Sequence, residues 1–75
     1  MLLTELKPGT HGIITDLSKI DRLIRRRLLD LGVVEGERVQ YKSAMPFGGP
    51  YMLEICGQCI GIRRKEAMHI SVECE

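Results

Sequence analysis

The chain has 75 residues, of which 44% are hydrophobic and 28% are charged, and its formal net charge is +1. These values are typical of one globular domain over residues 1–75, and the near-neutral charge and three aromatic residues argue against a nucleic-acid-binding protein. No apolar run reaches the length of a membrane span, and the N-terminus lacks the basic start of a signal peptide. Together with an odd number of cysteines, this predicts a cytoplasmic protein with reduced thiols.

The first part of the chain predicts a strand and then a helix. The strand is expected over residues 12–17, and residues 18–31 form the one clear helical pattern. Ser18 is expected as the N-cap, Asp21 as its capping-box partner and Gly32 as the residue that ends the helix. At 100° per residue, five apolar side chains share one stripe that should pack on the sheet: Ile20, Leu23, Ile24, Leu28 and Leu31.

The rest of the chain predicts four more strands and one helical turn. In order, we expect a strand at 38–44, a loop rich in Pro and Gly at 45–50, a hairpin at 51–63, a helical turn at 64–68 and a last strand at 69–73. Val39 and Tyr41 should face inward, as should Ile70 and Val72. Because a chain this small removes its sheet edges best by rolling up, we expect a mainly β fold, a small SH3-like barrel of about five strands with one inserted helix.

The predicted hairpin contains a C-x-x-C spacing in "EICGQCIGIR". A two-residue turn at 57–58 would pair Cys56 directly with Cys59 on the outer face. Two thiolates could supply half of a zinc or ferrous iron site, but neither His11 nor His69 is well placed to complete it. The alternatives are an incidental pair, adventitious Fe(II) or Zn(II) binding, and a functional metal site that needs a second copy or a partner. No required cofactor is expected.

The predicted helix carries a run of arginines around an apolar residue. Arg22, Arg25 and Arg26 fall on the outer side of the helix, and Leu29 projects among them. An exposed Leu with a charged rim could bind a partner, although a plain solvated face is the simpler alternative. Arg27 falls inside the apolar stripe, so we expect it to hold the helix on the barrel through a hydrogen bond at the buried edge.

The loop "MPFGGP" presents a second candidate surface. Met45 and Phe47 could line a peptide-binding groove, or they could cap the open end of the barrel. Elsewhere the chain has no P-loop, no credible catalytic triad and no carboxylate pair at a site. We therefore expect a protein without catalytic activity.

Taken together, three segments of the sequence resemble the FeoA family. They are "RLLDLGVVEGERV", which fits R-L-x-x-L-G-x-x-x-G-x-x-V, the P-x-G-x-P loop "PFGGP", and "IRRKEAMHISVE", and the resemblance spans roughly residues 2 to 73. One departure is Gly49, which stands where the loop of the family usually has an acidic residue. The motif positions are Arg27, Leu28, Leu31, Gly32, Gly36, Pro46, Gly48 and Pro50.

The resemblance implies an accessory role in bacterial ferrous iron uptake. FeoA proteins are SH3-like and cytosolic, and they work with FeoB, a membrane permease with a cytosolic G-protein domain. On this basis the partner is FeoB, membrane contact occurs only through it, and nucleic acid is not bound. The alternative is a metal chaperone or sensor that uses Cys56 and Cys59. An exposed sheet edge or the face of these cysteines could also pair two copies of the chain.

Overall fold

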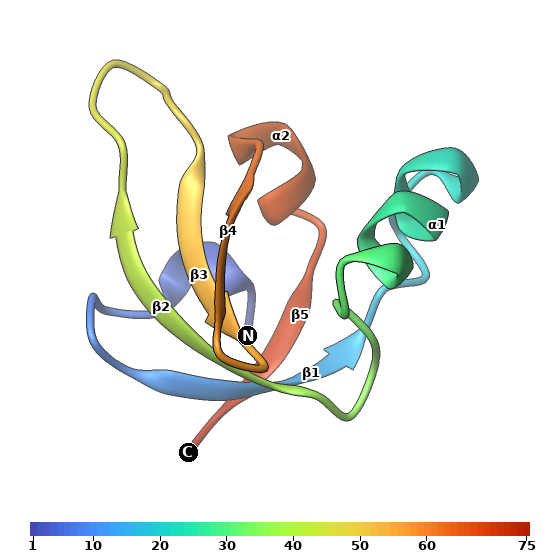
Figure 1. The fold of residues 1–75 in the computed structure, drawn as a ribbon, viewed down its shortest axis with the longest axis horizontal. Helices are drawn as coiled ribbons and strands as arrows, with labels where there is room; N and C mark the ends of the chain where they lie inside the picture. The colour runs from blue at the N-terminus through green and yellow to red at the C-terminus, as the bar shows by residue number, and fades with distance from the viewer.

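Five antiparallel strands form one sheet that bends around the core, with two short helices at its margins (Figure 1). The computed structural model describes residues 1–75. The chain is mainly β, as predicted, and its architecture is consistent with an SH3-like fold. The elements are η1 Leu3–Glu5, β1 His11–Asp16, α1 Arg22–Asp30, β2 Arg38–Ala44, β3 Tyr51–Ile55, β4 Gln58–Ile62, α2 Arg64–Ala67 and β5 Ser71–Cys74.

The strand order is β4-β3-β2-β1-β5, so the sheet is curved but is not closed by hydrogen bonds. Strands β4 and β5 are its two edges, whereas a fully closed barrel would have paired them. The predicted strand at 38–44 and the helical turn near 64–68 are confirmed, the latter as α2. The short helix η1 was not predicted. It lies beside β5, where the Leu3 N–H donates a hydrogen bond to the Ile70 carbonyl (2.8 Å).

The core lies on the concave face of the sheet. The inward positions predicted from alternation are confirmed, because Val39, Tyr41, Ile70 and Val72 are all buried. In the hairpin, Leu53 faces Ile60 and Tyr51 faces Ile62, and these four side chains are also buried. The core cluster is Leu3, Leu6, Ile14, Leu17, Ile20, Leu28, Val33, Val39, Tyr41, Tyr51, Leu53, Ile55, Ile60, Ile62, Ala67, Ile70 and Val72.

Helix α1 is shorter than predicted and packs through one edge only. The backbone N–H of Ser18 donates to Oδ1 of Asp16 (2.8 Å), which places Ser18 in a turn, and Asp21 is the N-cap residue. The predicted Ser18 cap is therefore wrong. Leu23 is 78% exposed and Leu31 is 40% exposed, so they do not belong to the core stripe. A nine-residue helix at the margin of the sheet buries a narrower stripe than its apolar pattern suggests.

The end of α1 is fixed by a Schellman motif, as the position of Gly32 predicted. The N–H of Gly32 donates to the Leu29 carbonyl (3.0 Å), and the N–H of Val33 donates to the Leu28 carbonyl (2.8 Å). Gly32 has φ +90°, and the side chains of Leu28 and Val33 are both buried. This motif turns the chain toward β2 and leaves Leu29 on the outer side of the helix.

Candidate partner-binding surfaces

Leu29 lies at a hollow between α1 and the segment that joins α1 to β2. The hollow has a volume of about 250 Å³, and Leu29 itself is 57% exposed. Its lining is mainly apolar, with one cation and one anion: Leu17, Arg25, Leu29, Val33, Val34 and Glu35. We call this feature the α1 hollow. Its size and apolar lining suit one inserted apolar side chain of a partner.

Two charged side chains border the α1 hollow and differ in how firmly they are held. Oε2 of Glu35 accepts a hydrogen bond from the backbone N–H of Leu17 (3.0 Å), which ties the carboxylate to the end of β1. Arg25 takes part in no ion pair, so its guanidinium is free to bind a carboxylate or carbonyl of a partner. The hollow thus combines an apolar interior with a fixed acceptor and a free donor.

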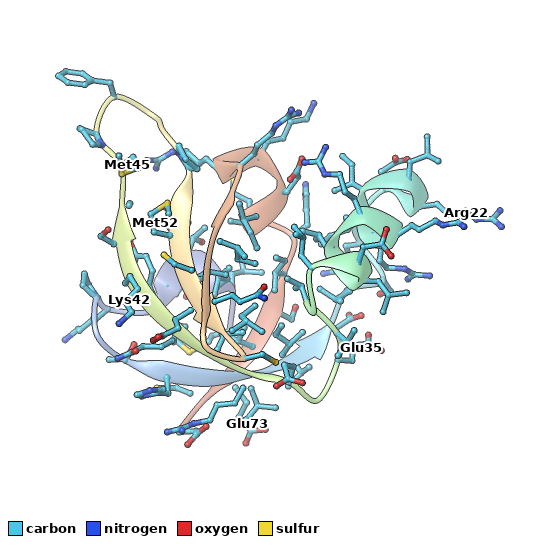
Figure 2. The ribbon with its side chains drawn as sticks, viewed as in Figure 1. Arg22, Glu35, Lys42, Met45, Met52 and Glu73 are labelled. Atoms are coloured by element: carbon cyan, nitrogen blue, oxygen red, sulfur yellow. The ribbon has the colours of Figure 1, made fainter.

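The structure brings together only part of the arginine cluster predicted around Leu29. Arg25 lines the hollow with Leu29, whereas Arg22 and Arg26 are exposed but do not line it. Arg22 extends outward from α1, away from the sheet (Figure 2). Arg27 is exposed and makes neither a side-chain hydrogen bond nor an ion pair, so its predicted role at a buried edge is wrong. The one-edge packing of α1 leaves no buried margin at this position.

Sequence reasoning missed four residues of the α1 hollow: Leu17, Val33, Val34 and Glu35. A signal was present for Val33, because an apolar residue directly after the Gly of a Schellman motif packs on the last turn of its helix. No comparable signal marked Glu35, whose hydrogen bond to Leu17 spans eighteen residues. That contact depends on how β1 and the α1–β2 segment meet in space.

The loop between β2 and β3 leaves its apolar side chains in solvent. Phe47 is fully exposed, at 104%, and Met45 is about half exposed, so the alternative in which they cap the barrel is wrong. The loop is closed by a hydrogen bond from the Met45 N–H to the Pro50 carbonyl (2.9 Å). A Cβ atom at Gly49 would lie 2.7 Å from that of Met45. An acidic residue therefore cannot occupy position 49 unless the backbone moves.

The two cysteines of the C-x-x-C spacing are not directly paired. The turn consists of Cys56 and Gly57, both with positive φ, and Cys59 stands opposite Glu54. The thiol of Cys56 donates to Oε1 of Glu37 (3.5 Å). This hydrogen bond, with some burial, raises the pKa of Cys56 and disfavours the thiolate that a metal requires.

No group of three or more His, Cys, Asp or Glu side chains is arranged to hold a metal ion. The three cysteines are free and exposed. A metal site built on Cys56 and Cys59 would therefore need ligands from outside the chain. Neither helix has the length and apolar character needed to cross a membrane.

Sequence and fold are both similar to those of known proteins. The sequence profile described as FeoA domain matches residues 1–74. The solution structure of a FeoA protein from Chlorobium tepidum is 35% identical, with a TM-score of 0.90 over 99% of this chain and 70% of that one. The solution structure of iron(II) transport protein A from Clostridium thermocellum is 32% identical, with a TM-score of 0.87 over 99% of this chain and 45% of that one.

The fold also occurs in larger proteins. A manganese-dependent transcriptional repressor is 20% identical and has a TM-score of 0.90, over 100% of this chain and 36% of the repressor. At this identity the likeness concerns the fold alone. No curated protein sequence gives a significant match.

Proposed function

Because the chain belongs to the FeoA family, which is associated with ferrous iron transport, we propose that it is a non-catalytic accessory protein that docks on the cytosolic side of the FeoB permease. Being cytoplasmic, it would meet the G-protein domain of FeoB and change transport by binding one conformation of the permease more tightly than another. The strongest support from the structure is the α1 hollow, where an exposed Leu borders an apolar interior with a free arginine.

Docking at the α1 hollow follows the usual pattern of a small protein interface. An apolar side chain of FeoB would enter beside Leu29, while Arg25 would pair with an acidic or carbonyl group at the rim. Leu17 and Val33 form a rigid base because both are buried in the core of the domain. A preformed site of this kind loses little conformational entropy on binding.

Leu29→Asp tests the proposal, and Leu23→Asp is its matched control. Both residues are exposed positions of α1 and both changes add one negative charge, but only Leu29 lines the hollow. Loss of a central apolar anchor should weaken FeoB binding by about tenfold or more, whereas Leu23→Asp should change it by less than about threefold. Binding is measured by surface plasmon resonance on detergent-solubilised FeoB, and circular dichroism verifies the fold of each variant. Equal effects of the two variants, or none from Leu29→Asp, would contradict docking at this site.

A further inference from the structure

A second exposed region lies at the end of the molecule formed by the β2–β3 loop and α2 (Figure 1). The loop and the α2 segment line one shallow hollow together, so they form a continuous surface. We call it the loop–α2 surface. Its residues are the lining residues Gly48, Gly49, Pro50, Arg63, Arg64, Lys65 and Met68, together with Met45 and Phe47 of the loop.

Three consecutive cations give the loop–α2 surface a strong local charge in a chain whose net charge is only +1. Arg63, Arg64 and Lys65 are exposed, and neither ion pair of the structure includes them. Arg63 and Lys65 also border a hollow toward α1 that contains Asp21 and Glu66, yet they form no ion pair there. Glu66 follows them in sequence and is 5% exposed, so the segment 63–66, with three cations and one carboxylate, keeps a net charge of +2.

Arg64 is held in place, whereas its two neighbours are free. Its guanidinium carbon lies 5.1 Å from the ring centroid of Tyr51, and its Nη1 donates to the Tyr51 hydroxyl (3.3 Å). Arg63 and Lys65 make no side-chain hydrogen bond. Two unpaired cations therefore flank one held cation, an arrangement that suits several phosphate groups spread over an area better than one small anion.

The apolar part of the loop–α2 surface is also exposed to solvent. Phe47, with φ +59°, is fully exposed, and Met45 and Met68 are each about half exposed. The hydrogen bond from the Met45 N–H to the Pro50 carbonyl closes the loop. No other part of the chain buries the Phe47 ring. The ring leaves water when a binding partner surrounds it, as the interface of a bilayer does.

We propose that the loop–α2 surface binds the headgroup region of an anionic phospholipid bilayer. The cations would contact lipid phosphates while Phe47 enters the interface between headgroups and acyl chains. An acidic peptide would satisfy the cations but would leave the ring of Phe47 unburied. This contact does not depend on docking to FeoB, and it differs from the expectation that the chain meets a membrane only through a partner.

Vesicle sedimentation tests the proposal without any protein partner. The full chain is mixed with vesicles of phosphatidylcholine alone, or with one third phosphatidylglycerol, at about 0.1 M salt, where the Debye length is about 10 Å. Each cation near an anionic surface contributes about 1 kcal/mol, or about fivefold in partitioning. Arg63→Gln/Lys65→Gln should therefore weaken binding by about 25-fold, while Arg64 keeps its contact with Tyr51.

Two further variants test whether vesicle binding depends on the loop–α2 surface itself. The alternatives are an effect of overall charge and binding through α1. Phe47→Asn keeps a residue that tolerates positive φ and should weaken partitioning by about tenfold. Arg22→Gln/Arg26→Gln removes the same charge from α1 and should have little effect. Failure of the wild-type chain to prefer anionic vesicles would overturn the proposal, as would equal losses in the two double variants. Tight binding of a poly-glutamate peptide without vesicle binding would also overturn it, in favour of an acidic peptide.

Discussion

Three leucines of α1 should differ sharply in their effect on stability when each is replaced by Ala. Leu28 is 2% exposed and belongs to the same core cluster as Val33, whereas Leu23 and Leu29 project into solvent. Loss of a buried Leu side chain costs about 2–5 kcal/mol, since the transfer term and the cavity term add. A chain of 75 residues has a free energy of unfolding of only about 4–11 kcal/mol, so Leu28→Ala should remove a large part of it.

The two exposed positions provide the internal comparison. Leu23→Ala and Leu29→Ala should each change the free energy of unfolding by less than about 1 kcal/mol, because little buried area is lost and Ala favours the helix. Urea denaturation followed by circular dichroism gives all three values from the shift in midpoint. A cost for Leu23→Ala equal to that of Leu28→Ala would refute the orientation of α1, and with it the exposure of Leu29 to a partner.

Two predictions concern ionisable groups. Glu37 accepts the hydrogen bond of the Cys56 thiol and raises its pKa. Glu37→Gln should therefore speed alkylation of Cys56 by iodoacetamide at mildly alkaline pH, while the alkylation rate of Cys59 stays the same. Mass spectrometry of the modified peptides measures both rates, and equal rates with and without the substitution would contradict the contact. Hydrogen bonds from the side chain and the backbone N–H of Ser18 lower the pKa of Asp16 below its ordinary value of 3.8. The ionised carboxylate therefore stabilises the fold above pH 3.8, and this stabilisation is lost as the pH falls through the lower pKa of the folded state. The difference in unfolding midpoint between the wild-type chain and Asp16→Ala should thus be largest near neutral pH and disappear in acid. A difference that grows on acidification would show that the pKa of Asp16 is not lowered in the folded state.

The strands were predictable because alternation is a local property of the sequence. The segment 38–44 was predicted with its exact bounds and with Val39 and Tyr41 inward. The turn of the next hairpin was placed one residue too late. Moving a two-residue turn by one position shifts the pairing by two residues, which leaves the same side chains inward. Hydrophobic pattern alone therefore could not choose between the two registers.

What decides the hairpin and the helix is tertiary contact. The turn requires Cys56 to adopt φ +52°, and the hydrogen bond of Cys56 to Glu37 of a distant segment supports that arrangement. In α1 the apolar pattern was compatible with a stripe that included Leu31, but the helix touches the core along one edge only. The local sequence pattern predicted the role of Gly32 correctly, because that role lies in the backbone of the helix end itself.

The central claim is that this chain acts by binding FeoB. The most direct test is affinity purification with the tagged full chain as bait on native membranes in mild detergent, with and without guanine nucleotide, followed by mass spectrometry. We expect FeoB to be recovered with the wild-type bait and to be depleted with Leu29→Asp, and any dependence on nucleotide to show which state is favoured. Recovery of no permease by a folded bait would contradict the proposed function.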